Sequence, residues 1–484
     1  MKFHSFLIVL LILPLVFAVT PSFTFHAMND IHINPFYDPN IPIQQYCSRS
    51  MSFSSFQSPD VISSNYSSIG RFGCDPPYSL LQLMLKKTKS SSKTVPDFML
   101  LPGDFVSHGY SQDPSGNYST LKYEILKEIL RRTSLEINVE FPDTFLFPAI
   151  GNNDVQFHYQ VPTLLDKEKY YSMLFEIWFE KNPKNMLLKN IDEIKVDFLN
   201  GGYYKADLSD NFSVIVLNTL YYSISNNNSN DPKAGDTQIE WLENKLDDIK
   251  KKIGKVIVVY HIFPGLNYYN GIQYFLNKTA NEKIQSLFYQ YKEIIVLNVA
   301  SHIHMNGFRV NHLENNTSDP EITNRETYGH TIISGSVSPI FYNNPSFLTV
   351  EIEEFKPKNA KYTYFNLKEF LNSSNREEMN FDEINSFFFD YDLNQAYDLL
   401  DVDVKSLADL AGKLFENEEL LRKFLVLTYG YPDTKENRDF VLGLYMNLGL
   451  FTNNENWEFD EMEKKKFLCT LIEMGEIGFK KCIG

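Results

Sequence analysis

The sequence predicts a layered α/β domain followed by a helical C-terminal region. Up to about residue 355, short apolar runs typical of strands alternate with amphipathic stretches typical of helices, which indicates layers of both kinds. Beyond that point helical stretches follow one another with few strands between them. The 484 residues, of which 43% are hydrophobic and 15% aromatic, suffice for one large core and a smaller one.

The individual elements follow from the same patterns. The expected strands are Phe23–Met28, Asp97–Leu101, Phe145–Ile150, Val214–Leu217, Lys255–Tyr260, Ile294–Ala300 and Thr331–Ser334. The expected helices between them are Ser79–Lys87, Thr120–Thr133, Lys167–Glu180, Thr237–Ile253 and Ala280–Tyr291. Later helices are expected at Leu367–Leu371, Ser406–Phe415, Asn417–Leu427 and Asp460–Glu473. We therefore assign residues 21–355 to the α/β domain and residues 356–484 to a helical subdomain.

Residues 1–18 predict a secretory signal peptide. Lys2 supplies a positive charge, residues 6–17 form a largely apolar run, and Ala18 is the small residue that a signal peptidase requires. The run is too short for a permanent transmembrane helix. A buried N-terminal helix is the alternative interpretation. We expect a monomer that is secreted, or lies in the lumen of a lysosome or vacuole, without stable membrane insertion.

Glycosylation sites and cysteines agree with secretion. Asn-x-Ser/Thr acceptor sites occur at Asn65, Asn117, Asn211, Asn227, Asn277, Asn315, Asn316 and Asn372, although several would arise by chance in an Asn-rich chain. The four cysteines form two local groups, Cys47 with Cys74 and Cys469 with Cys482. An even count suggests two disulfides, and proximity favours pairing within each group, but three connectivities are possible.

The charge balance excludes some partners. The chain has 45 Lys and Arg against 61 Asp and Glu, a formal net charge of −16. Nucleic-acid polymers and anionic membranes attract clusters of Lys and Arg, so neither is an expected partner. A phosphate-bearing substrate would therefore need another source of attraction, and a metal ion is the obvious one.

Five polar segments lie at the ends of predicted strands. They are Asn29-Asp30-Ile31-His32, Pro102-Gly103-Asp104-Phe105-Val106-Ser107-His108, Gly151-Asn152-Asn153-Asp154, Val259-Tyr260-His261 and Ser301-His302-Ile303-His304. Sites are assembled in such loops, and this mixture of oxygen and imidazole donors suits two neighbouring divalent transition metals. Each segment alone could be a hydrogen-bonded structural group, as we expect for His26, His312 and His330. Together and in this order they predict a metal site.

The order Asp-x-His, Gly-Asp, Gly-Asn, His and His-x-His resembles the calcineurin-like metallophosphoesterase superfamily. Further segments are similar to its acid sphingomyelinase-like phosphodiesterase branch. They are Gly70-Arg71-Phe72-Gly73-Cys74-Asp75-Pro76-Pro77, His108 four residues after Asp104, Ser336-Val337-Ser338-Pro339, and Tyr391–Leu399 with the Cys469/Cys482 pair. The resemblance covers about Phe23 to Cys482. It implies a four-layer α/β/β/α sandwich with residues 21–355 as the catalytic domain.

The resemblance also implies a cofactor and its ligands. One metal ion would be bound by Asp30, His32, Asp104 and His304, and the second by Asp104 as a bridge, Asn152, His261 and His302. Zinc is the expected metal. Two ions can clamp a phosphate and activate a bridging hydroxide that attacks phosphorus, without a covalent intermediate. Ser107 stands where purple acid phosphatases carry an iron-binding Tyr, so the sequence disfavours a tyrosinate-iron site.

The sequence departs from the superfamily at a catalytic position. Asn153 replaces the usual histidine near the scissile phosphate, and the endopolyphosphatases of this branch share Gly-Asn-Asn-Asp, with a His close behind, much like His158. Asn153 cannot titrate, so His108 is the candidate acid for the leaving group, and nearby cations should lower its pKa. Alternatively, His108 only orients the loop or a ligand. His158 is a weaker alternative acid.

Three functions are compatible with these residues. The favoured one is a phosphodiesterase for soluble phosphoesters such as nucleotides or choline-containing diesters. The second is hydrolysis of sphingomyelin or of polyphosphate by the same centre. Phe23 follows the signal directly, which leaves no room for a saposin-type lipid domain and weakens the lipid version, and the net charge of −16 weakens the polyphosphate version. The third is a metal-bound binding protein that has lost catalysis at Asn153.

Overall fold

The structure is a computed structural model that describes residues 22–49, 67–91, 96–113, 119–227, 230–269, 271–312, 326–453 and 456–484. The predicted signal peptide, residues 1–18, lies outside these ranges, as do the acceptor sites Asn65, Asn117, Asn315 and Asn316.

The described residues form strands and helices in alternation. The strands are β1 (Ser22–Ala27), β2 (Phe98–Leu101), β3 (Phe145–Pro148), β4 (Tyr204–Ser209), β5 (Phe212–Val216), β6 (Lys255–Val259), β7 (Leu266–Asn267), β8 (Gln273–Tyr274), β9 (Ile295–Ala300), β10 (Gly307–His312), β11 (Thr327–Ile333), β12 (Ser346–Glu353), β13 (Lys356–Phe365), β14 (Phe388–Asp392), β15 (Phe451–Asn453) and β16 (Glu458–Phe459). The helices are α1 (Tyr78–Ser91), α2 (Thr120–Glu140), α3 (Lys167–Phe175), α4 (Ile191–Gly201), α5 (Ala234–Lys251), α6 (Lys278–Gln290), α7 (Leu367–Asn372), α8 (Phe381–Asn385), α9 (Leu393–Tyr397), α10 (Val404–Glu416), α11 (Glu418–Thr428), α12 (Lys435–Met446), α13 (Glu461–Ile472) and α14 (Glu476–Ile483).

Within the described ranges, two six-stranded sheets carry the fold. Their strand orders are β14-β13-β12-β1-β2-β3 and β10-β11-β9-β6-β5-β4. In the first sheet β1, β2 and β3 run parallel, and in the second β11, β9, β6 and β5 do so. These parallel strands are largely buried, and their composition is aromatic and β-branched, as strands covered on both faces require. Their carboxyl ends therefore come to one edge.

The two sheets pack face to face. The Phe212 ring of β5 lies 4.5 Å from the Phe23 ring of β1 and 6.4 Å from the Phe98 ring of β2. Two buried tyrosines also join the sheets, because Tyr204 Oη donates to the Pro148 carbonyl and Tyr362 Oη donates to the Ile333 carbonyl. Aromatic side chains thus fill the space between the sheets, and buried hydroxyls fix how one sheet lies on the other.

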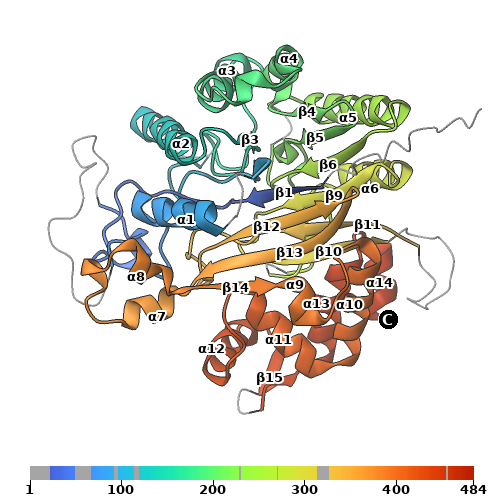
Figure 1. Cartoon of the computed structure of the whole chain (residues 1–484). Coiled ribbons are helices and arrows are strands. Elements are labelled where there is room, and N and C mark those ends of the chain that lie inside the picture. Colours follow the sequence, from blue (N-terminus) through green and yellow to red (C-terminus); the bar gives the residue numbers. More distant parts are fainter. Residues whose placement is uncertain are drawn as a thin grey trace, which may run out of the picture.

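Helices cover the outer faces of this sandwich. In Figure 1, α1 and α2 lie on one side of the strands, and α5 and α6 lie on the other. The buried residues of α2 recur at helical spacing, with Ile125, Ile129 and Ile137 on the face turned to the core. The predicted four-layer α/β/β/α arrangement is confirmed.

The C-terminal helices gather beside β10 and β11 (Figure 1), where α10 and α13 contact these strands. Side chains of Asp403, Asn417 and Thr434 cap the first turns of α10, α11 and α12. The helical region nevertheless begins later than residue 356. Residues 356–365 and 388–392 are the strands β13 and β14, which extend the first sheet. The start of β13, Lys356-Pro357-Lys358-Asn359, has no alternation of apolar and polar residues that would predict a strand.

Each cysteine pairs within its own group. Cys47 is bonded to Cys74, and Cys469 in α13 is bonded to Cys482 in α14. Among the described residues, no helix has the length and apolar composition that crossing a membrane requires.

We predict that removing the Cys469–Cys482 bond lowers the free energy of unfolding. The cysteines are 13 residues apart, and cross-linking a loop of this size stabilises by about 3 kcal/mol through the entropy of the unfolded chain. Urea unfolding of a Cys469→Ser/Cys482→Ser double variant measures the loss. A reducing buffer should destabilise the wild type more than this variant, because the variant has only the Cys47–Cys74 bond left to lose. Unfolding curves that coincide for variant and wild type would contradict the prediction.

Candidate metal centre

The five predicted polar segments come together at one edge of the sandwich. Each follows the carboxyl end of a parallel strand: β1, β2 and β3 in the first sheet, and β6 and β9 in the second. Because the sheets are packed face to face, loops far apart in sequence become neighbours. The Asp30 amide donates to Gly103 O, and the His302 amide donates to Asp30 Oδ2. The sequence prediction that these segments share one site agrees with this placement.

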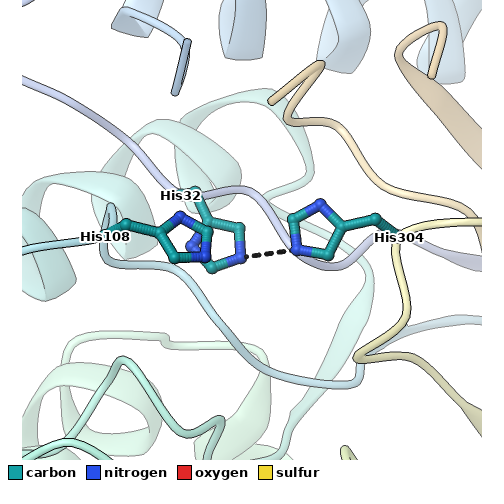
Figure 2. A group of neighbouring side chains, drawn as sticks. All are labelled: His32, His108 and His304. Atoms are coloured by element: carbon teal, nitrogen blue, oxygen red, sulfur yellow. Dashed lines mark hydrogen bonds between the residues drawn. The ribbon is translucent and has the colours of Figure 1, made fainter. Parts of the chain in front are cut away.

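One group of donor atoms is formed by Asp30, His32 and His304. The His32 and His304 rings face each other with their Nε2 atoms 3.1 Å apart (Figure 2), and each Nε2 lies 3.9 Å from Asp30 Oδ1. His32 Nδ1 donates to the Val106 carbonyl at 2.9 Å, which leaves the lone pair of Nε2 directed into the group. This is the arrangement of a metal-ligating imidazole.

A second group is formed by Asp104, Asn152, His261 and His302. His261 Nε2 lies 2.9 Å from Asn152 Oδ1, 3.2 Å from His302 Nδ1 and 3.4 Å from Asp104 Oδ2. Asp104 Oδ2 also lies 3.4 Å from His32 Nε2, so this carboxylate stands between the two groups. The other nitrogen of His261 contacts Pro102 O and Ser301 Oγ, which fixes the ring.

The backbone at this site is unusual. Asp30, His32, Asp104, His302 and His304 all have positive φ, between 44° and 82°. Non-glycine residues rarely adopt this conformation, although Asp and His tolerate it better than most, and it costs about 1–3 kcal/mol per residue. Three of the five loops thus hold left-handed backbone at residues whose side chains are donors.

Asp154 and Gly151 determine how the Asp104 loop sits. The buried Asp154 carboxylate accepts hydrogen bonds from the backbone amides of Asp104, Phe105, Val106 and Gly151, at 2.7–3.2 Å. A Cβ on Gly151 would lie 2.2 Å from both the amide nitrogen and Oδ1 of Asp104. The close approach of the two loops therefore requires glycine at position 151.

Burial shapes the charges of the donors. Burial, followed by the effect of His261, lowers the pKa of His302 to about 3, and burial with the effect of His108 lowers that of His32 to about 4. Burial also lowers the pKa of His261, but the carboxylates of Asp104 and Asp30 outweigh it and raise the value to about 9. His32 and His302 are thus neutral at pH 7 and can offer lone pairs to a cation.

The donor set fits two divalent cations. Nitrogen ligands 2.0–2.1 Å from a tetrahedral zinc ion are roughly 3.4 Å apart, which is close to the separations described above. Asp30 Oδ1 is buried and has no hydrogen-bond partner in the described part of the chain, although it faces two imidazoles. Such an orphaned carboxylate oxygen needs a positive partner. We find the residues expected for both ions adjacent to one another.

His108 and Asn153 also lie at the centre, but in different surroundings. The His108 ring stacks on His32 at 4.2 Å (Figure 2), and its Nδ1 donates to Asp75 Oδ2 at 2.9 Å. Burial lowers the pKa of His108, but Asp75 together with Asp104 and Asp30 outweighs burial and raises this pKa above the ordinary value. The sequence reasoning considered only the cations and missed Asp75. Asn153 donates from its backbone and side chain to the Asp104 carboxylate, at 2.7 and 2.9 Å.

A cleft of about 420 Å³ opens above the donors. Tyr159 and Phe275 wall it near His302, and Phe341 lies 4.7 Å from the His304 ring. The C-terminal region contributes Tyr429 and Leu444. Among the described residues that line the cleft there is no Lys or Arg. Apart from the donors, its walls are largely aromatic and aliphatic.

Comparison of the sequence with known proteins identifies the family of the chain. The sequence pattern of the calcineurin-like phosphoesterases matches residues 23–306, more than half of the chain. The chain belongs to this family. The metal-dependent phosphoester hydrolase predicted from the five segments is thereby confirmed.

Curated relatives support the predicted branch. The chain is 26% identical over 361 residues to sphingomyelinase phosphodiesterase D of Dictyostelium discoideum, covering 73% of this chain and 75% of the relative. It is 27% identical over 447 residues to the cyclic GMP-AMP phosphodiesterase SMPDL3A of Rattus norvegicus, covering 88% and 89%. It is 26% identical over 413 residues to the acid sphingomyelinase-like phosphodiesterase 3b of Mus musculus, covering 83% and 82%. The resemblance to the acid sphingomyelinase-like branch is confirmed.

Asp75, Asp154 and Ser338 lie in the segments described above, but the sequence alone predicts no role for them. Ser338 Oγ donates to Asp75 Oδ1, so the two segments together orient His108. The role of Asp154 depends on four backbone amides that only folding brings to its carboxylate.

We predict that Gly151→Ala displaces Asp104 and reduces metal binding. A misplacement of about 1 Å at a catalytic centre lowers the rate on the order of 100-fold. Metal content by mass spectrometry and turnover of a chromogenic diester measure both effects. The matched control is Gly307→Ala, because a Cβ at Gly307 meets no atom within 4 Å. Equal metal content and rate in the two variants would refute the requirement for glycine at position 151.

Proposed function

We propose that the protein is a phosphodiesterase for small, soluble phosphoesters, such as nucleotides or choline-containing diesters, and that it acts outside the cell or in the lumen of a lysosome or vacuole. The observation that carries the proposal is the pair of donor groups that share Asp104 at the floor of a cleft with apolar walls. Phosphodiesterase names among the relatives support the reaction type. The proposal is tested first by turnover of bis-p-nitrophenyl phosphate, which a chelator should abolish and added zinc restore.

The proposed cofactor is a pair of zinc ions. Asp30, His32, Asp104 and His304 would hold one ion, and Asp104, Asn152, His261 and His302 the other. Imidazole nitrogen with carboxylate and amide oxygen is a donor mixture that zinc accepts. When bound, the pair supplies Lewis-acid neutralisation of the phosphate charge and a nucleophilic water. The chain's own residues hold the donors in place and line the space that the substrate enters.

The walls of the cleft support a diester over a long polyanion. A diester carries one negative charge and two organic groups, and aromatic walls give those groups apolar contact area. Polyphosphate carries many charges that side chains would have to neutralise. Lys and Arg are absent from the described lining, and the net charge of −16 repels such a chain. An endopolyphosphatase activity is therefore disfavoured.

Sphingomyelin hydrolysis is the second candidate. The aliphatic and aromatic part of the cleft, with Phe341 47% exposed at its edge, could contact an acyl chain, and one relative is named a sphingomyelinase phosphodiesterase. Extracting a lipid from a bilayer, however, costs about 0.8 kcal/mol per CH₂ exposed to water. The remaining alternative, a binding protein without catalysis, is disfavoured because the donor set is complete and His108 is held at the cleft.

His108 is the proposed acid for the leaving group. Asp75 Oδ2 accepts from both the backbone amide and Nδ1 of His108, so the ring is fixed and its Nε2 is turned away from Asp75. Asp75 also favours the protonated ring, which is the form that can donate. Asn153 is less suited to this role, because its amide is engaged with Asp104 and does not titrate.

Secretion is supported by the two disulfides and by exposed acceptor sites. Asn211, Asn227 and Asn372 are exposed, which a glycan requires. Asn277 is half-buried, and its side chain caps α6 and donates to Tyr222 O. We propose the three exposed sites as the glycosylated ones within the described chain.

We predict a higher kcat/KM for nucleotides or short choline diesters than for sphingomyelin in vesicles or for polyphosphate. Soluble phosphoesters do not need to leave a bilayer, and they bring fewer charges to an acidic protein than polyphosphate does. Initial rates over this substrate panel, at one pH and one zinc concentration, give the order. A kcat/KM for vesicle sphingomyelin above that for every nucleotide and every short choline diester would overturn the substrate assignment.

We predict that His108→Ala slows esters with poor leaving groups roughly 10²–10⁴-fold and p-nitrophenyl esters far less. An alkoxide needs a proton to leave, whereas p-nitrophenolate does not. Asp75→Asn should change the same ratio in the same direction, because Asp75 orients and charges the ring. Metal content must stay at the wild-type value. Equal losses on both esters, or loss of metal, would show that His108 orients the loop or binds metal instead.

A further inference from the structure

The side-chain amide of Asn152 lies between two imidazoles. Its Oδ1 is 2.9 Å from His261 Nε2, and its Nδ2 is 3.0 Å from His158 Nε2. His261 belongs to the second donor group, whereas His158 lies outside both groups and follows Asn152 by six residues. The amide therefore has one end toward the proposed metal position and the other toward His158.

The two ends of an amide differ chemically although their shapes are nearly the same. Only the carbonyl oxygen can bind a cation, and the NH₂ group is a donor without a lone pair to offer. A half-turn of the side chain would present the wrong end to the metal. The orientation of the amide therefore depends on the group on the side away from the metal position. A hydrogen-bond acceptor there binds the NH₂ group and so directs the carbonyl oxygen toward the metal.

His158 is held where it can be this acceptor. Its backbone amide donates to Gln112 O at 2.8 Å, and Gln160 Nε2 donates to its carbonyl at 3.1 Å. Gln112 belongs to the segment after β2, and the Gln112 amide in turn donates to Gln156 O. The His158 segment is thus tied to the loop region that carries Asp104.

We propose that His158 is a positioning residue for the second metal site: its Nε2 accepts a hydrogen bond from Asn152 Nδ2 and so presents Asn152 Oδ1 to the ion. The inference rests on the proposed function only through Asn152 as a metal ligand. This role replaces the interpretation of His158 as an alternative acid, because His158 Nε2 already accepts a hydrogen bond from Asn152 Nδ2.

Binding of the second ion tests the proposal without reference to any substrate. Cobalt titration of the metal-free protein, followed by visible absorption and by calorimetry, resolves two binding steps. His158→Phe keeps an aromatic ring but removes the acceptor. It should weaken the Asn152-dependent step about 10–100-fold, the usual effect of losing a hydrogen-bond partner of a ligand, and leave the other step unchanged. His158→Gln should recover part of the loss, since its carbonyl can accept.

A second background tests orientation itself. Asn152→Asp replaces the amide by a carboxylate whose two oxygens are equivalent, so neither end needs to be selected. In this background His158→Phe should change the affinity for the second ion only a few-fold. A loss as large as in the Asn152 protein would show that His158 acts in some other way than by orienting the amide.

The remaining outcomes are distinct. Wild-type affinity for both ions in His158→Phe would overturn the proposal, and so would weakening of both steps together with a lower Tm, which would indicate a role in folding. If Asn152→Ala binds both ions with wild-type affinity, the assignment of Asn152 as a ligand fails, and with it this part of the proposed function.

Discussion

The Asp104 carboxylate occupies the position on which both donor groups depend. Its Oδ2 lies 3.4 Å from an imidazole nitrogen of each group, so a small shift of this side chain would separate them. Three features keep it there. Gly151 has no Cβ, and any Cβ there would collide with Asp104. The Asp154 carboxylate accepts hydrogen bonds from backbone amides of both loops, and the Asn153 side chain donates to the Asp104 carboxylate. These residues lie in the loops after two neighbouring strands, β2 and β3.

The sandwich supplies the rigidity that such a site needs. Two sheets joined by aromatic packing between Phe23, Phe98 and Phe212 bring the ends of five parallel strands to one edge. The loops there contain Asp and His donor residues whose backbone is left-handed. Asp30 Oδ1 is also buried without a hydrogen-bond partner among the described residues. Each of these features is unfavourable alone. A bound cation would offset the cost of these features at the donors.

Much of this could be predicted from the sequence, because the central strands and the donor motifs are both local signals. The runs at 255–260 and 294–300 predicted strands, and the structure has β6 and β9 there. The strand β13 was not predicted, because its first residues are Lys, Pro and Asn and its apolar period appears only near Tyr362. Asp75 acts on His108, 33 residues away in the sequence. Asp154 acts through four backbone amides, and the role of His158 depends on the rotation of the Asn152 side-chain amide. None of these leaves a pattern in the sequence.

The central claim is that two ions share Asp104. Metal analysis of the purified protein, combined with anomalous diffraction at the zinc edge, measures it most directly when wild type and Asp104→Asn are compared. We predict that the wild type binds two ions per chain, one on each side of Asp104. The variant should bind fewer ions and have almost no diesterase activity. A variant that retains two ions and a near-normal rate would contradict it.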